Sequence, residues 1–185
     1  MIYESLQSYP APESESVQNV LVRSRVACRL GDRKNAASPS SLVSETVKML
    51  VYPVAVSFGS KGDYKIWAGE GWHHDPSDES HTWTAHVAEL RMPLTRSRVP
   101  LVLELDLIPK GNSQDVFAYL NGSFATFWHI DGPVSKTAVL APSLLRPNEN
   151  LIQIVCPRAV LPGPGPDQRV LGVALRSLRI VEDAP

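Results

Sequence analysis

The chain has 185 residues and a formal charge of −1 at pH 7, from 18 Lys and Arg against 19 Asp and Glu. That length suits one domain, and a near-neutral charge excludes the basic footprint of a typical nucleic-acid-binding protein. Hydrophobic residues make up 43% of the chain, enough for a core, and no stretch approaches the roughly 18 apolar residues of a membrane span. We therefore expect a globular protein that binds no nucleic acid and has no membrane span. No secretory signal is visible at the N-terminus, so we expect it in the cytoplasm.

The N-terminal segment differs in composition from the rest. Residues 1–16 are polar, with two prolines and three glutamates, which predicts an extended arm. Alternating apolar and polar residues begin at residue 17, so we expect one domain over 17–183. Cys28 and Cys156 lie in apolar runs, which predicts two buried thiols and no disulfide framework.

Short alternating segments follow one another along the chain, separated by Pro, Gly and Asn clusters. The clearest is 101–108, where four leucines share one face and Glu104 and Asp106 share the other. No window predicts an amphipathic helix of three turns. The other expected strands are 20–30, 43–58, 83–94, 136–140, 150–156 and 170–181. This pattern predicts an all-β, antiparallel β-sandwich of jelly-roll type.

The segment 115–130 contains Asn121-Gly122 between two apolar runs, which predicts a two-residue hairpin of type I′. With that turn, Tyr119 pairs with Phe124 and Phe117 with Thr126. One expected face then carries Phe117, Tyr119, Phe124 and Trp128, and the other carries Val116, Ala118, Leu120, Ala125 and Phe127. Because both faces are apolar, we expect the hairpin to lie centrally in a sheet.

Four motifs follow one another along the second half of the chain and the segment before it. They are GEGWHHDPSDESHTWT at 69–84, the hairpin VFAYLNGSFATF, APSLLRPNENLIQIVCP at 141–157 and PGPDQRVLGVALRSLRI at 164–180. Over about 66–183 the order resembles galactose-binding-like β-sandwiches. It is similar to the accessory domains of bacterial glycosyltransferases and cell-surface polysaccharide enzymes. The resemblance implies a non-catalytic module whose partner is a carbohydrate or a glycan-synthesis protein.

The 69–84 loop gathers the residues best suited to bind a ligand. Its tryptophans offer rings that stack on sugar faces, and its carboxylates accept hydrogen bonds from sugar hydroxyls. Asp167 and Arg169 lie two apart on an extended segment and point the same way. The expected ligand-binding residues are Trp72, Asp75, Asp78, Glu79, Trp83, Asp167 and Arg169. The alternatives are core tryptophans, a solvated loop, and an Asp167–Arg169 pair that only fixes a loop, with Glu79 as a candidate partner of Arg169.

Histidines cluster in the same region. His73, His74 and His81 are candidate ligands of a transition metal, and Asp75, Asp78 and Glu79 are oxygen donors that suit calcium. A metal-dependent jelly-roll enzyme using the His73–His86 cluster is therefore one alternative function. A self-assembling structural jelly roll is another, and homo-oligomerisation stays open.

Glu104 and Asp106 have the spacing of paired carboxylates on one strand face. They could cleave a glycosidic bond or simply lie on the solvated face of a sheet. Our leading interpretation assigns no catalytic residue. It is a carbohydrate-binding or interaction module associated with glycan biosynthesis.

Overall fold

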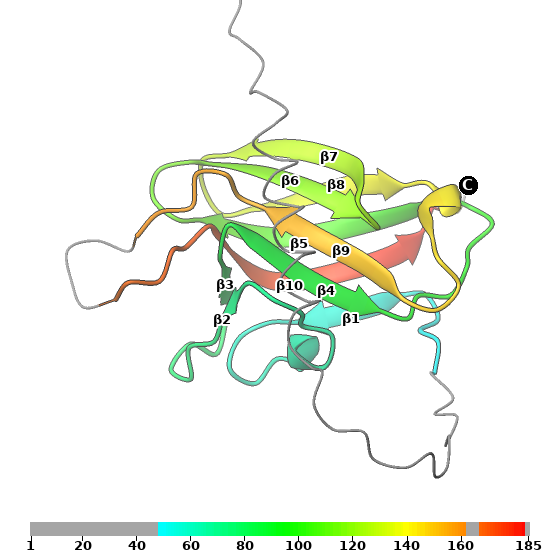
Figure 1. The fold of residues 1–185 in the computed structure, drawn as a ribbon, viewed down its shortest axis with the longest axis horizontal. Helices are drawn as coiled ribbons and strands as arrows, with labels where there is room; N and C mark the ends of the chain where they lie inside the picture. The colour runs from blue at the N-terminus through cyan, green and yellow to red at the C-terminus, as the bar shows by residue number, and fades with distance from the viewer. Residues whose placement is uncertain (1–47, 162–166, 184–185) are drawn as a thin grey trace, which may run out of the picture. The chain divides into compact units, whose positions relative to one another are not determined.

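The computed structural model describes residues 48–161 and 167–183. The expected arm at 1–16, the expected strand at 20–30 and Cys28 lie outside the described residues. Within them, the structure is the antiparallel β-sandwich of jelly-roll type that the alternation predicts (Figure 1). No helix in the described part of the chain is long and apolar enough to cross a membrane.

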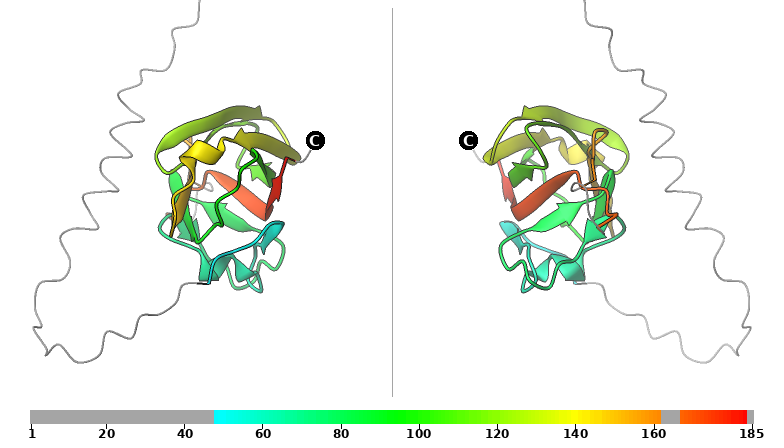
Figure 2. Two further views of the ribbon diagram at one scale, coloured as in Figure 1. Left: turned by 90° about the vertical axis from the view of Figure 1, so that its right-hand side faces the viewer. Right: turned by 90° about the vertical axis from the view of Figure 1, so that its left-hand side faces the viewer.

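The strands form two stacked sheets, which Figure 2 shows in end-on views. The six-stranded sheet has the order β2-β3-β10-β5-β8, and β1 pairs with the second half of β10. Its strands are β1 (Val54–Ser57), β2 (Trp72–His73), β3 (Thr82–Thr84), β5 (Leu101–Pro109), β8 (Val134–Leu140) and β10 (Val173–Glu182). The four-stranded sheet has the order β4-β9-β6-β7, with β4 (Val87–Met92), β6 (Gln114–Leu120), β7 (Ser123–Ile130) and β9 (Asn150–Val155). Two 3₁₀ turns, η1 (Asp63–Ile66) and η2 (Pro142–Leu144), lie in the connections.

The β5 strand confirms the period of two. Its leucines at 101, 103, 105 and 107 are at most 1% exposed and face the other sheet. Glu104 and Asp106 lie on the outer face, as predicted. Since β5 lies between β10 and β8, its inner face meets the core along its whole length.

The turn at Asn121-Gly122 is also confirmed. Both residues have positive φ, 56° and 83°, and Leu120 pairs directly with Ser123. The Asn121 side chain accepts a hydrogen bond from the N–H of Leu151 at 2.9 Å, which ties the hairpin to the start of β9. Leu145, which follows η2, is buried in the core.

The register of the hairpin differs from the prediction beyond that turn. A β-bulge shifts it, so Tyr119 pairs with Phe124 but Phe117 pairs with Phe127 and not with Thr126. The extra residue reverses the later side chains of β7, so Trp128 is buried and Phe127 is exposed. The central location was wrong as well, because β7 is an edge strand of the four-stranded sheet.

Leu105→Ala tests the packing of this core. Leu105 is 1% exposed, so its truncation leaves a cavity, and we expect the free energy of unfolding to fall by about 2–5 kcal/mol. Val139→Ala on β8 is the control, because Val139 is 62% exposed and we expect a change of at most about 0.5 kcal/mol. Urea denaturation of both variants measures the difference. Equal midpoints for the two variants contradict the assigned inner face.

Candidate functional site

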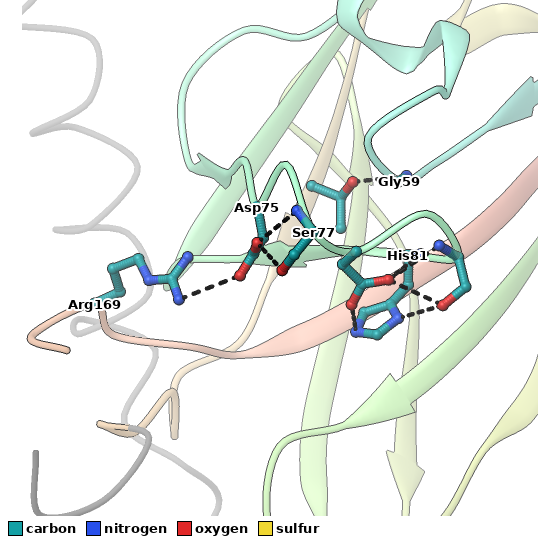
Figure 3. Close-up of polar contacts among 8 residues, drawn as sticks. Gly59, Asp75, Ser77, His81 and Arg169 are labelled. Atoms are coloured by element: carbon teal, nitrogen blue, oxygen red, sulfur yellow. Dashed lines mark hydrogen bonds and ion pairs between the residues drawn. The ribbon is translucent and has the colours of Figure 1, made fainter.

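Two segments that the sequence analysis singled out meet at the approach to β10. Arg169 forms a two-pronged ion pair with Asp167, with Nη2 2.6 Å from Oδ2 and Nε 2.9 Å from Oδ1. Its Nη2 also lies 3.9 Å from Oδ2 of Asp75, a contact drawn in Figure 3. The structure therefore brings Asp75, Asp167 and Arg169 together, but their charged groups already face one another.

The 69–84 loop uses its carboxylates to hold its own turns. Asp75 accepts hydrogen bonds from the hydroxyl and N–H of Ser77 at 2.6 and 3.0 Å (Figure 3), and these lower the pKa of Asp75. Burial raises the pKa of Asp78, but hydrogen bonds from Ser80 and His81 outweigh it and the pKa is lowered. Both side chains therefore stabilise the loop.

Glu79 is not the partner of Arg169. It lies at the tip of these turns, where its Oε1 is 2.6 Å from Nζ of Lys61. Both side chains are largely exposed, so this ion pair contributes little to stability. Asp75 takes the place beside Arg169 that the sequence analysis gave to Glu79.

Trp72 is a core residue, so the alternative of a core tryptophan is confirmed at this position and the expectation of an exposed platform is wrong. Its side chain packs against Phe58 and Tyr64, with ring centroids 5.3 and 5.7 Å away, and the residue is 9% exposed. Its indole N–H donates to the carbonyl of Glu89 at 2.7 Å. The preceding Gly71 has a φ of 83°, and a Cβ there would lie 1.7 Å from the carbonyl oxygen of Val87. Only glycine lets the chain pass this close to β4.

The three candidate metal ligands do not converge. His73 Nε2 lies 2.9 Å from the carbonyl of Val170, His74 contacts the hydroxyl of Tyr64, and His81 Nε2 lies 2.8 Å from Oδ2 of Asp78. Within 48–161 and 167–183, no group of three or more His, Cys, Asp or Glu side chains is placed to hold a metal ion. His73 and His74 are neighbours in an extended segment, so their side chains point to opposite sides.

Trp83 lies on the outer side of the six-stranded sheet and is half-buried. Its ring meets His81 edge to face at 5.3 Å, and Nζ of Lys110 lies 5.2 Å from the ring centroid. Part of this ring is therefore occupied by side chains of the protein itself. A ligand-binding role for Trp83 stays a prediction.

Cys156 is a free thiol that is 0% exposed, as the sequence analysis expected. Burial raises its pKa to about 12. A thiol with such a pKa carries almost no thiolate at neutral pH, so Cys156 does not act as a nucleophile.

The outer side of the four-stranded sheet carries Phe117, Tyr119 and Phe124, which the sequence placed on one face, but sequence reasoning missed that this face is exposed and that Phe127 belongs to it. Phe117 and Tyr119 project from β6, and Phe124 and Phe127 project from β7. Phe124 is 57% exposed and Phe127 is 46% exposed. Phe117 and Phe127 have ring centroids 4.9 Å apart, and those of Tyr119 and Phe124 are 5.8 Å apart. We call these four residues the aromatic face.

The sequence did contain a signal for this surface. The hairpin is apolar on both sides, which we attributed to a central position. An edge hairpin with the same pattern must instead expose one apolar side to solvent. Exposed apolar patches on a folded domain mark interaction sites.

A rigid polar pair adjoins the aromatic face. Tyr119 pairs across the sheet with Gln153 on β9, and Gln153 pairs with Glu89 on β4, so the three side chains form one row. Gln153 donates from Nε2 to Glu89 Oε1 at 3.1 Å, and Arg91 donates from Nη2 to Glu89 Oε2 at 3.2 Å. Glu89 and Gln153 are only 5% and 4% exposed. Burial and mutual hydrogen bonds fix this carboxylate and this amide beside the rings.

Comparison with known proteins gives remote likenesses. No family model matches the chain, and no curated protein matches it. Among solved structures, one similar fold is the CBM36-1 domain of a multidomain xylanase from the hindgut metagenome of Trinervitermes trinervoides. It has 12% identity and a TM-score of 0.44, and the match covers 72% of this chain and 99% of that domain.

Two further similar structures carry related descriptions. The Podospora anserina GH26-CBM35 β-(1,4)-mannanase has 13% identity and a TM-score of 0.47, with 72% of this chain and 28% of that one covered. A carbohydrate-binding module CBM36 in complex with calcium and xylotriose has 8% identity and a TM-score of 0.39, with 69% and 98% covered. The described part of this chain is itself a β-sandwich with an exposed aromatic face.

The pKa of Asp167 tests the charge cluster at the approach to β10. Hydrogen bonds from Arg169 lower this pKa to about 2, from an ordinary value of about 3.9. The carboxylate therefore keeps its ion pair above pH 4 and loses it only as the pH falls toward 2. Carboxyl ¹³C NMR titration should give a pKa well below 3 in the native protein and near the ordinary value in Arg169→Gln.

Arg179→Gln is the matched control, because Arg179 pairs with Glu104 instead. We expect it to leave the pKa of Asp167 unchanged. A native Asp167 that titrates near pH 4 contradicts the assigned ion pair.

Proposed function

We propose that this protein is a non-catalytic carbohydrate-binding module and that the aromatic face binds the glycan. The observation that carries the proposal is the set of four rings on one outer sheet surface, two of them about half exposed. They lie on neighbouring strands, so backbone hydrogen bonds hold the surface in place.

The chemistry of this surface suits a sugar. One side of a pyranose ring presents C–H groups, which pack on the negative face of an aromatic ring. The hydroxyls at the rim of the sugar need acceptors and donors, and the hydroxyl of Tyr119 supplies both. The Glu89–Gln153 pair is buried and already hydrogen-bonded, so it braces β4 and β9 beside Tyr119.

The proposal of a non-catalytic role is supported by what the reactive groups do. The Cys156 thiol is buried with a raised pKa. Asp167 is ion-paired to Arg169, and Glu104 to Arg179. Burial keeps the Cys156 thiol neutral because it raises the pKa, and Arg169 keeps Asp167 charged because it lowers the pKa.

We further propose that the module accompanies glycan biosynthesis. The support is the resemblance, in motif order over about 66–183, to accessory domains of glycosyltransferases and polysaccharide enzymes. Chemical cross-linking in the native cells tests this part. Recovery of a glycan-synthesis enzyme is the expected result, and cross-links only to unrelated proteins contradict it.

Self-association is a second candidate function, and the exposure of Phe124 and Phe127 favours it. Two copies that bury these rings against each other would also remove apolar surface from water. Light scattering separates the two functions. A monomer across the concentrations at which polysaccharide binds supports the glycan site, and a dimer that dissociates on Phe124→Ala supports self-association.

Truncating a residue of the aromatic face should weaken glycan binding without unfolding the protein. Affinity electrophoresis in gels containing xylan, mannan, β-glucan or pectin measures the dissociation constant for each polymer. We expect Tyr119→Ala and Phe124→Ala each to weaken binding by about thirtyfold, equivalent to about 2 kcal/mol for a central aromatic residue of a binding site. Phe124 is 57% exposed, so the melting temperature of its variant should change by only a few degrees.

Val139→Ala is the control for general loss of exposed apolar surface, since Val139 is exposed on the other sheet. It should bind like the native protein. Binding that survives both aromatic truncations shows that the aromatic face is not the glycan site.

A further inference from the structure

The outer side of the six-stranded sheet carries a polar hollow that the proposed function does not use. It measures about 340 Å³ and is lined from β5, β8 and β10. We call it the β5 groove. The side chains that face it are those of Glu104, Asp106, Ser135, Thr137, Ser177 and Arg179. This volume lies at the lower end of the range of small-molecule sites, about 300–1,000 Å³.

The register of the strands explains why the sheet is hollow here. Ser135, Asp106 and Ser177 face one another in one row across β8, β5 and β10. Thr137, Glu104 and Arg179 form the next row. The side chains of the two serines and the threonine are short, so a shallow hollow forms beside the two carboxylates.

The two carboxylates differ in their partners. Glu104 Oε2 accepts a hydrogen bond from Arg179 Nη1 at 3.3 Å, which makes an ion pair. Asp106 Oδ1 accepts only a hydroxyl hydrogen bond from Ser135, also at 3.3 Å. In the part of the chain that the structure describes, no basic side chain forms an ion pair with Asp106. This carboxylate therefore keeps acceptor positions that face the hollow.

The groups of the β5 groove match a neutral, hydroxyl-rich ligand. The side chains that face it include two carboxylates, Glu104 and Asp106, and one basic group, Arg179, which is paired with Glu104, so the groove does not favour a net anion. A carboxylate accepts two hydrogen bonds from adjacent hydroxyls, and the serine and threonine hydroxyls can both donate and accept. No aromatic side chain lines this hollow, so a sugar would bind through its edge and not through its face.

We propose that the β5 groove is a second saccharide-binding site, with Asp106 holding two adjacent hydroxyls of one sugar. The groove stands on its own lining and does not depend on the aromatic face. The two outer faces lie on opposite sides of the sandwich (Figure 2). If both sites bind, one molecule therefore holds two glycan chains, and this consequence rests on the proposed function.

Chemical-shift mapping of ¹⁵N-labelled protein tests the proposal. The probes are methyl glycosides of mannose, glucose, galactose and xylose, which differ in the orientation of adjacent hydroxyls. We expect at least one of them to shift the amides of Ser135, Thr137 and Ser177. The shifts should persist in Tyr119→Ala, because that residue lies on the other sheet.

Asp106→Ala is the groove variant, and Val139→Ala on the neighbouring edge strand β8 is its control. Asp106→Ala removes a hydrogen-bonding carboxylate, so the dissociation constant obtained from the groove shifts should rise about tenfold. Val139→Ala should leave them unchanged. Matching melting temperatures of the two variants show that folding is not the cause.

The outcomes separate this proposal from the proposed function. Shifts confined to the four-stranded sheet overturn the β5 groove as a site and leave the aromatic face in place. Shifts in the groove alone overturn the aromatic face and support the groove. No groove shift with any of the four glycosides contradicts the second site, and release of methanol from a glycoside would assign hydrolysis to Glu104 and Asp106 instead of binding.

Discussion

One extra residue in β7 decides which aromatic rings of this protein meet solvent. The bulge opposite Ala118 and Tyr119 moves Phe127 to the outer side of the four-stranded sheet and turns Trp128 into the core. Without the bulge, the side chain of Trp128 would point to the outer side like that of Phe124, and this edge of the core would lose its largest side chain. The composition of the exposed aromatic surface, with Phe127 in place of Trp128, therefore depends on this single irregularity in the ladder.

The sequence predicts the parts of the structure that local rules control. The leucine row of β5 and the turn at Asn121-Gly122 follow from side-chain alternation and from the backbone conformations that those two residues tolerate. The bulge was not predictable in this way, because no residue type in Ala125-Thr126 demands it. For Trp72 the sequence left two alternatives open, a core ring and an exposed platform, for a related reason. A Gly-Trp pair in a polar loop gives no sign that the ring will be packed against Phe58.

The candidate site shows the same division. Composition singled out the 69–84 loop, and the structure does bring Asp75 to Arg169. Yet the carboxylates of Asp75 and Asp78 accept hydrogen bonds from serines of the same loop and so stabilise its turns. The row formed by Glu89, Gln153 and Tyr119 comes from three strands far apart in the sequence, so only strand pairing reveals it. Loops rich in Asp and Ser attract attention in a sequence, whereas a binding surface on a sheet is assembled by register.

A crystal structure of the protein with the best-binding oligosaccharide tests the central claim most directly. The account predicts a sugar ring stacked on Tyr119 or Phe124, with a sugar hydroxyl within hydrogen-bond distance of the Tyr119 hydroxyl. An oligosaccharide held instead between Asp75 and Arg169, with the aromatic face bare, would contradict it.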